Sequence, residues 1–399
     1  MTDHLYYDDS YLIEFTATVL EVRGRGHKTA AVLDRTAFYP TSGGQPHDTG
    51  TLGNTPVVEV EECENESILH ILDSPVAPGP VAGHIDWARR FDHMQQHTGQ
   101  HILSQAFLKV AKAPTISFHL GQESCTIDIE LSVPTVELMH AAEELASSVV
   151  FENRPVNVLY VDRSQLATLG VRKETLREGI LRVIEVADFD RSPCGGTHVR
   201  HTGEIGMISV LDFERYKGGT RVEFACGKRV LRILRKDHDL LKTLGKLHSA
   251  HPHELPRLLE KIQDERSTLA RENGRLREQM LEIEALDLTN RAERRDGKAI
   301  VKRRYSDRNL ESVKLLAQKV AALPGGVAIL GLEQNEAQVV VARSADVTGN
   351  CGAAIKEFAA KFGGKGGGRP EIAQAGGIPR DSLDAWLDAL EQYFLNQFC

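Results

Sequence analysis

The sequence lacks any long run of uncharged apolar residues. No stretch of about eighteen such residues occurs, whereas a helix that crosses a bilayer needs about twenty. The chain starts with MTDHLYYDDSYL, which is acidic and aromatic, while a secretory signal starts with basic residues followed by an apolar segment. We therefore expect a cytoplasmic protein with no membrane partner.

Cysteine pairs at metal-binding or redox spacing are also missing, since no CxxC occurs. The thiols lie far apart along the chain, at Cys63, Cys125, Cys194, Cys226, Cys351 and Cys399. In a cytosolic chain of this size, such cysteines are free thiols rather than a disulfide framework. Each is expected to be a small buried apolar side chain, except for Cys194, which is a candidate metal ligand.

Positive charge is scarce for a protein that might bind nucleic acid, because the net charge is −8. Residues 1–227 carry 19 basic and 32 acidic side chains, a net charge of −13, and residues 228–399 carry 29 and 24, a net charge of +5. The second part is therefore the better candidate for contacts with backbone phosphates.

With 399 residues, the chain is long for one compact domain, and its pattern predicts four parts. Residues 1–88 contain short alternating strands and turns, which predict a small β-barrel. Residues 89–227 predict helices packed on one face of a sheet. Residues 228–297 predict a long helical hairpin or coiled-coil linker, and residues 298–399 a C-terminal α/β domain. The predicted fold class is α+β.

Two long charged helices are expected at Lys228–Leu247 and Pro256–Leu288, separated by the proline-bearing segment 251–256. The second helix carries a heptad seam, formed by Leu259, Ile262, Arg266, Leu269, Asn273, Leu276, Met280 and Ile283. One interpretation is an intramolecular hairpin. The other is a homodimer, formed through these helices or through the C-terminal domain.

A pattern typical of metal ligands starts where the helical pattern of residues 91–112 starts. His93, His97 and His101 are spaced by four residues, so either neighbouring pair can converge on one ion from a helix face. Cys194 and His198 are also four apart and bracket two glycines, as in a turn that presents thiolate and imidazole together. A tetrahedral set of nitrogen and sulfur ligands suits Zn²⁺ better than Mg²⁺ or Ca²⁺.

Several motifs occur in a fixed order along nearly the whole chain. They are FYPTSGGQPHDTG at 38–50, HTGQH at 97–101, PCGGTH at 193–198, GTRVE at 219–223 and the glycine-rich segment 363–377. In these motifs the sequence resembles the editing half of alanyl-tRNA synthetases and, more closely, the free-standing AlaX-type alanyl-tRNA editing proteins of the long form. The glycine-rich segment is similar to the loop of the DHH-associated domain at the end of full synthetases.

The resemblance implies one zinc ion per chain, with four side chains as both metal ligands and catalytic residues: His97, His101, Cys194 and His198. His93 is then left as a solvated or hydrogen-bonding residue. The resemblance also implies that the C-terminal segment contacts tRNA through Gly364, Lys365, Gly366, Gly367, Gly368 and Arg369. Glycine amides between two cations are typical of an anion-binding loop.

These motifs predict a trans-editing hydrolase that acts on alanine tRNA carrying the wrong amino acid. We expect zinc-dependent ester hydrolysis of seryl-tRNA(Ala), with glycyl-tRNA(Ala) as a secondary substrate. We expect neither ATP use nor aminoacylation, since about ten residues precede the first strand. The substrate is expected to contact Thr41, Ser42, Gly43, Gly44 and Gln45, a segment that equally fits a tight turn of the barrel.

No glutamate stands inside the HxxxH motif, unlike in HExxH peptidases, so Asp92 and Glu185 are only weak candidates for a general base. A zinc peptidase and the editing region of threonyl-tRNA synthetases use similar ligands, but the GGQ motif and the C-terminal glycines favour the alanyl system. The alternative from another class is a non-catalytic tRNA-binding accessory protein with a structural zinc.

Overall fold

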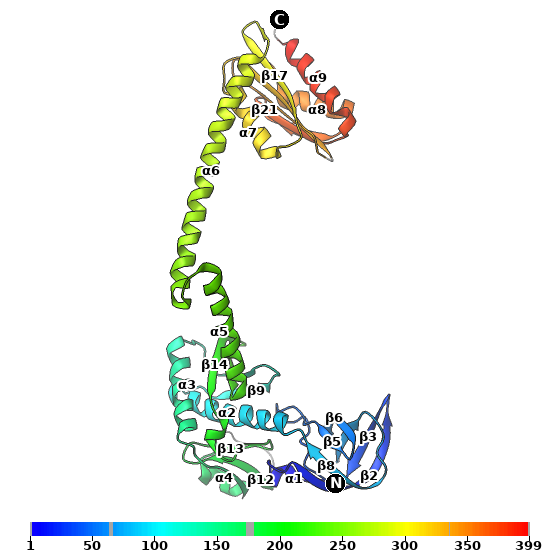
Figure 1. Ribbon diagram of the computed structural model, residues 1–399, viewed down its shortest axis with the longest axis vertical. Helices are drawn as coiled ribbons and strands as arrows, with labels where there is room; N and C mark the ends of the chain where they lie inside the picture. Colours follow the sequence, from blue (N-terminus) through cyan, green and yellow to red (C-terminus); the bar gives the residue numbers. More distant parts are fainter. Residues whose placement is uncertain (1, 64–66, 173–178, 335, 398–399) are drawn as a thin grey trace. The chain divides into compact units, whose positions relative to one another are not determined.

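The computed structural model describes residues 2–63, 67–172, 179–334 and 336–397. The chain divides into two compact units, Met1–Ser249 and Ala250–Cys399 (Figure 1). No helix in the described ranges combines the length and the apolar character that crossing a membrane requires.

The first unit begins with a closed six-stranded barrel. Its strands follow the order β2 (Glu14–Arg25), β3 (Lys28–Leu33), β7 (Ile68–Leu72), β6 (Thr55–Glu62), β5 (Gly50–Leu52) and β8 (Gly79–Ile85). In β2, Phe15, Ala17 and Val19 are buried while the residues between them are exposed, as expected when one face of a strand lines a core. Ahead of the barrel, β1 (Asp3–His4) pairs with β4 (Arg35–Thr36) and leads into the short helix α1 (Leu5–Asp8).

The long helix α2 (Trp87–Ala111) runs from the barrel towards α3 (Val136–Phe151) (Figure 1). Asp86 caps its N-terminus by accepting a hydrogen bond from the Arg89 backbone N–H. Nearly every residue from His93 to Phe107 is buried, because α2 is packed on several sides. Within this helix, Met94, Ile102, Leu103 and Phe107 belong to the core of the unit.

Two antiparallel sheets complete the first unit around α2. One has the order β14 (Ile208–Tyr216), β15 (Gly219–Cys226), β10 (Cys125–Ile129) and β9 (Thr115–Leu120). The other has the order β11 (Val156–Asp162), β12 (Ile180–Val186) and β13 (Asp190–Pro193). The helix α4 (Arg163–Leu169), the 3₁₀ turn η1 (Thr202–Ile205) and the helix α5 (Lys228–His248) belong to the same unit.

The second unit contains the 3₁₀ turn η2 (Pro252–Glu254), the 37-residue helix α6 (Leu255–Arg291) and a six-stranded sheet. The sheet has the order β16 (Arg294–Arg295), β17 (Lys298–Tyr305), β18 (Gly326–Leu332), β19 (Ala337–Arg343), β21 (Ile372–Ile378) and β20 (Lys365–Gly368). The remaining elements are α7 (Leu310–Ala321), α8 (Cys351–Phe362), η3 (Arg380–Ser382) and α9 (Leu383–Leu395). Two apolar cores lie on this sheet, one with α6 and α7 and the other with α8 and α9.

The predicted α+β class, the N-terminal barrel and the C-terminal domain are confirmed. The residue pattern also predicts a helix over Ser164–Glu178. The helix α4 ends earlier, at Leu169, because Gly170 follows with a φ of +63°, which a right-handed helix excludes. Residues 173–178 lie outside the described residues. The division into parts at residues 88, 227 and 297 stays a prediction.

The apolar residues of the predicted heptad seam are all exposed on α6, with Leu269 at 64% and Met280 at 70%. A different face of the helix packs in the core of the second unit, where Leu281, Ala285 and Leu288 are buried together with residues of α7. The seam is therefore a second apolar face. The intramolecular hairpin and the two-chain coil both stay predictions, since α5 and α6 fall in different units.

Candidate metal centre

The barrel is joined to α2 by a buried ion pair. Arg90, on the first turn of α2, and Asp48, in the barrel motif, are both fully buried. The Arg90 guanidinium donates through Nε to both Asp48 carboxylate oxygens, at 3.1 Å each, and also to the carbonyl of Ala37. A pair this well bonded is strongly destabilising to break from one side. It places the GGQ turn of the barrel beside the helix turn that carries His97.

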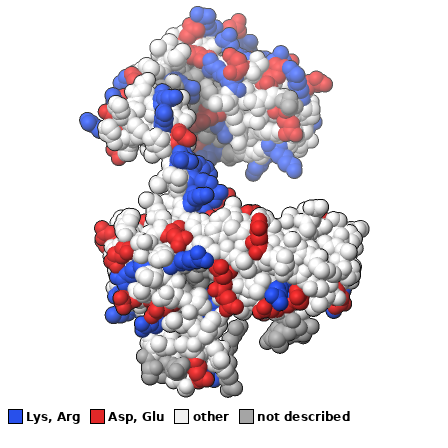
Figure 2. All heavy atoms as spheres, turned by 60° about the horizontal axis from the view of Figure 1, so that its bottom comes forward, with Lys and Arg blue, Asp and Glu red and all other residues white. Residues whose placement is uncertain are grey.

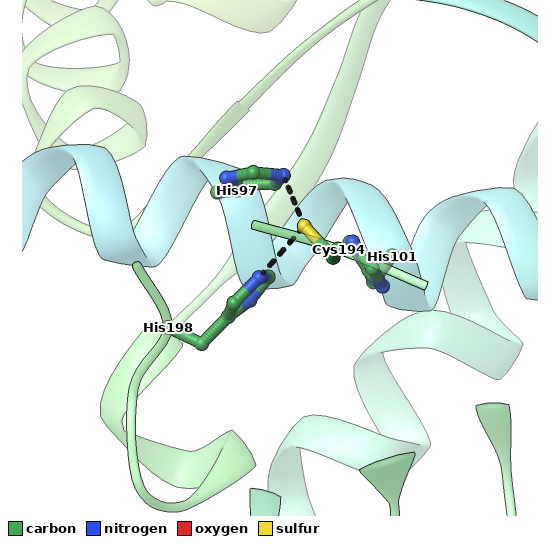
Figure 3. A group of neighbouring side chains, drawn as sticks. All are labelled: His97, His101, Cys194 and His198. Carbon is green, nitrogen blue, oxygen red and sulfur yellow. Dashed lines mark hydrogen bonds between the residues drawn. The ribbon is translucent and has the colours of Figure 1, made fainter. Parts of the chain in front are cut away.

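His97 and His101 lie one turn apart on α2 and present their rings on the same side of the helix (Figure 3). Both are nearly inaccessible to solvent, at 3% and 4% exposure. The choice between the two predicted histidine pairs therefore falls on His97 and His101, which meet Cys194 and His198 in one cluster.

The bend that carries Cys194 and His198 follows β13. Its backbone is held by Arg182 of β12, whose Nη1 donates to the carbonyls of Cys194 at 2.7 Å and Gly196 at 3.0 Å. Gly196 lies against the ring of His97, because a Cβ built there would be only 2.2 Å from the ring atom Cε1. The second glycine of the CGGTH motif thus allows the bend to approach the helix closely enough for thiolate and imidazoles to meet.

The sulfur of Cys194 is close to two ring nitrogens. Its Sγ lies 3.4 Å from Nε2 of His97 and 3.3 Å from Nε2 of His198 (Figure 3). One ligand atom from each of the four residues lies within 4.8 Å of all the others. Zinc bonds of about 2.0 Å to nitrogen and 2.3 Å to sulfur, at a tetrahedral angle, separate N and S by about 3.5 Å. The donor set and its spacing therefore fit a zinc ion.

Each histidine of the cluster has a partner at its other ring nitrogen. Nδ1 of His97 lies 2.8 Å from the side-chain carbonyl oxygen of Gln45, and Nδ1 of His198 lies 3.1 Å from the hydroxyl of Thr98. Nδ1 of His101 lies 3.2 Å from a carboxylate oxygen of Asp190. Occupied Nδ1 atoms leave all three Nε2 atoms for the cluster centre, as in metal sites with outer partners.

The electrostatics of the cluster favour the ligand form of Cys194 and His198, whereas at His101 they favour the protonated ring. Burial alone would raise the pKa of the Cys194 thiol, but the rings of His97 and His198 hold it well below its usual value. Burial lowers the pKa of His198 to about 3. Burial would also lower the pKa of His101, but its hydrogen bond with Asp190 raises it. A thiolate beside a neutral imidazole is the ligand form of both groups.

The predicted substrate segment is a tight turn. Ser42 and Gln45 exchange backbone hydrogen bonds of 3.1 and 2.9 Å around Gly43 and Gly44, which both have positive φ, as two-residue hairpin turns require. The turn directs Gln45 into the cluster, where its amide donates to the hydroxyl of Thr197 and accepts from the Thr197 backbone N–H. Gln45 therefore contacts the bend and a histidine, whereas Thr41 hydrogen-bonds His47.

The predicted glycine loop of the second unit is instead an edge strand. Residues 365–368 form β20, which pairs with β21 from Lys365 opposite Gly376 to Gly368 opposite Ala373. The glycines have a packing reason, since a Cβ at Gly366 would lie 2.7 Å from the Ile355 side chain of α8. A Cβ at Gly367 would meet nothing within 4 Å, and Lys365 and Arg369 are exposed. The expectation of a loop was wrong because β21 supplies the missing strand partner.

Three other residues considered from the sequence lie outside the quartet. His93 is buried, at 4% exposure, and burial lowers its pKa to about 3, so the solvated role is wrong and the hydrogen-bonding role stays a prediction. Asp92 forms an ion pair with Arg229. Glu185 pairs with Arg191. Both carboxylates already have a structural partner, which weakens their case as general bases.

Sequence reasoning missed the residues that surround the ligands, above all Asp190, Arg182 and Thr98. Thr98 stands inside the HTGQH motif, so its position next to His97 was a signal that it belongs to the site. Asp190 and Arg182 sit four and twelve residues before Cys194, and only the pairing of β12 with β13 brings them to the cluster.

Comparisons with known proteins found two matching domain families and relatives over nearly the whole chain. Residues 181–223 match the family of the threonyl and alanyl tRNA synthetase second additional domain, and residues 296–396 match the DHHA1 domain. The alanyl-tRNA editing protein AlaX-L of Pyrococcus horikoshii is 29% identical over 98% of this chain and 99% of its own length.

Longer relatives are also similar. The alanine–tRNA ligase of Natronomonas pharaonis is 34% identical over 97% of this chain, which spans 43% of that ligase. Among solved structures, the C-Ala domain of Aquifex aeolicus alanyl-tRNA synthetase is 20% identical and covers 26% of this chain and 96% of its own, with a TM-score of 0.24. The full-length similarity and the two domain matches confirm the relationship that the motifs indicated: the chain is related to the AlaX-type alanyl-tRNA editing proteins and to the editing and C-terminal domains of alanyl-tRNA synthetases.

Proposed function

We propose that this protein is a zinc-dependent hydrolase that removes wrongly attached amino acids from alanine tRNA. The observation that carries the proposal is the quartet of His97, His101, Cys194 and His198, in which the histidines are buried and Cys194 is half-buried. Their ligand atoms all lie within 4.8 Å of one another. The Pyrococcus horikoshii relative is named an alanyl-tRNA editing protein, which supports alanine tRNA as the partner.

A bound zinc ion would supply Lewis-acid chemistry, by polarising the ester carbonyl, lowering the pKa of a water or holding the substrate's α-amine. The chain's own residues would hold the ion through three imidazoles and one thiolate and would exclude bulk water, since each histidine is at most 5% exposed. Gln45, Thr98 and Asp190 would fix the orientation of the rings through the three Nδ1 contacts.

We further propose seryl-tRNA(Ala) as the preferred substrate and glycyl-tRNA(Ala) as a secondary one. A site that hydrogen-bonds a hydroxyl rejects the analogue lacking it far more strongly than an apolar pocket rejects a smaller side chain. Such a site would hydrolyse the serine ester and spare correctly charged alanine.

The experiment that tests this function is deacylation of seryl-, glycyl- and alanyl-tRNA(Ala), with and without a zinc chelator. We expect seryl-tRNA(Ala) to be hydrolysed at least about 100-fold faster than alanyl-tRNA(Ala), because the hydroxyl contact is lost with alanine. The chelator should abolish the reaction and added zinc should restore it. Equal rates on the seryl and alanyl esters would contradict the specificity, and full activity in chelator would contradict the zinc mechanism.

The second candidate function is a tRNA-binding accessory protein with a structural zinc, and the burial of the three histidines supports it as well. The same chelator treatment separates the two, because loss of a structural ion unfolds a small metal site whereas loss of a catalytic ion mainly removes activity. Circular dichroism of the zinc-free protein is the measurement.

We propose that β20 and its flanking cations contact the tRNA backbone. Lys365 and Arg369 are exposed at the two ends of the strand, and β20 lies at the edge of its sheet. A Cβ at Gly367 would meet none of the described residues within 4 Å, so the backbone there is open to close approach. On the face shown in Figure 2, basic and acidic side chains are mixed on both units. We therefore expect tRNA binding to depend more on a local pair of cations beside an accessible backbone than on the overall charge.

Replacing both cations, in a Lys365→Ala/Arg369→Ala variant, should weaken binding of alanine tRNA by about tenfold. It should also reduce the slope of log K against log salt concentration by about 2, because two phosphate contacts are lost. Filter binding at several salt concentrations measures both. A Lys28→Ala/Arg35→Ala variant removes the same charge from exposed positions of the barrel unit and should bind like the unmodified protein. Identical behaviour of the two variants would contradict the assignment.

A cytoplasmic location, one zinc per chain and a homodimer through the exposed α6 seam or the C-terminal domain remain part of this proposal. The seam supports a dimer because a row of exposed apolar residues at 3/4 spacing is the face that pairs in coiled coils.

A further inference from the structure

A buried carboxylate outside the quartet contacts one of its histidines. Asp190, the first residue of β13, is 3% exposed. Its Oδ2 lies 3.2 Å from Nδ1 of His101, and its Oδ1 accepts a hydrogen bond of 2.9 Å from Nε of Arg172. The hydroxyl of Ser192 donates to the same carboxylate at 3.1 Å. Asp190 therefore has three side-chain partners, and one of them is the His101 ring nitrogen that points away from the cluster centre.

Asp190 differs in charge from the partners of the other two rings. His97 contacts the neutral amide of Gln45, and His198 contacts the neutral hydroxyl of Thr98. Hydrogen bonds that involve an ionised acceptor are about twice as strong as neutral ones. A carboxylate at Nδ1 holds the proton on that nitrogen, so that Nε2 keeps its lone pair for a metal, and it makes the imidazole more basic.

Arg172 keeps the carboxylate in place. Its side chain is only 11% exposed, and Asp190 is fully buried, so the pair is weakly screened by solvent. The ion pair with Arg172 holds Oδ1 and leaves Oδ2 free to accept from His101.

We propose that Asp190 is a positioning residue that selects the His101 tautomer with a free Nε2 and thereby sets the affinity of the quartet for zinc, with Arg172 anchoring the carboxylate. Asp190 acts through His101 and contacts no substrate. The inference rests on the proposed metal site, so its test begins with zinc affinity and does not depend on activity.

The test compares zinc dissociation constants by competition with a chromophoric chelator, in the full-length protein. Asp190→Asn keeps the size of the side chain and removes its charge. We expect its affinity for zinc to fall by about 10–100-fold, the usual effect of removing an outer partner of a ligating histidine. Ser192→Ala removes another contact to the same carboxylate without touching His101, and its affinity should stay close to that of the unmodified protein.

A second readout separates tautomer selection from a general loss of packing. In the zinc-free protein, at a pH high enough for the His101 ring to be neutral, long-range ¹H–¹⁵N spectra should show its proton on Nδ1, and Asp190→Asn should shift the ring towards a mixture of tautomers. If Asp190→Asn does not fold, Arg172→Gln provides the test, since it frees the carboxylate but leaves it in contact with His101. Its affinity should fall less than tenfold.

The outcomes distinguish this inference from the proposed function. If the unmodified protein binds no zinc, both fail. If it binds zinc and Asp190→Asn binds equally tightly with an unchanged His101 tautomer, only the role of Asp190 is overturned. A weaker affinity with a mixed tautomer supports it.

Discussion

Cys194→Ala should abolish both stoichiometric zinc binding and deacylation of seryl-tRNA(Ala). The thiol is the donor nearest to two of the ring nitrogens, at 3.4 and 3.3 Å, and its low pKa supplies the one negative charge among the four ligands. Loss of an outer partner of a ligand already costs about 10–100-fold, so loss of the ligand itself should lower kcat/KM by more than about 100-fold. Zinc content by mass spectrometry and single-turnover deacylation are the measurements.

Cys63→Ala is the matched control, because Cys63 is a free, half-buried cysteine at the end of β6 and outside the quartet. It should keep one zinc per chain and full activity. If Cys194→Ala retained stoichiometric zinc and a rate within tenfold of the unmodified protein, the quartet would not be the catalytic metal site.

Gly196→Ala should be the most damaging single-methyl change in the CGGTH bend. The added Cβ would lie 2.2 Å from Cε1 and 2.4 Å from Nδ1 of His97, and 3.0 Å from the side-chain oxygen of Gln45. The ring or the bend must then move, which separates His97 from Cys194. We expect zinc affinity to fall by more than about tenfold and the free energy of unfolding to fall by about 1–3 kcal/mol, the usual range for overpacking a tight site.

The neighbouring glycine provides the comparison. At Gly195 a Cβ would come no closer than 3.6 Å to the hydroxyl of Tyr7, which is ordinary contact. Gly195→Ala should therefore bind zinc like the unmodified protein. Chelator competition compares the zinc affinity of the two variants, and thermal unfolding compares their stability. If both alanine variants lost the same affinity and stability, the cause would be a general stiffening of the bend and not the close approach of Gly196 to His97.

The four zinc-ligand candidates could be identified from the sequence because both pairs are local. His97 and His101 are one helical turn apart, and Cys194 and His198 bracket two glycines, so each pair is organised by its own few residues. Their choice over His93 came from the family resemblance. In the structure His97, His101, Cys194 and His198 converge on one cluster that could hold a metal ion, and their role as ligands stays a prediction.

The glycine motifs were harder to interpret because glycine allows turns, anion contacts and close packing alike. The GGQ segment is a hairpin turn that places the Gln45 side chain in hydrogen-bond contact with His97. In the second unit, the KGGG segment is a strand because β21 lies beside it, and its glycines let α8 pack against it. Neither outcome depends on the glycines alone.

The sequence by itself determined the α+β class, the barrel, the long helices and the four candidate metal ligands, because periodicity, turns and short spacings are properties of neighbouring residues. Only the tertiary structure decided which residues hydrogen-bond the Nδ1 atoms of the three histidines. The pairing of β12 with β13 brings Asp190 into contact with His101. The ion pair between Asp48 and Arg90 joins the barrel to α2, and Gln45 of the barrel contacts His97 of this helix. Such contacts join residues dozens of positions apart, and the packing of whole elements, rather than any local pattern, brings them together.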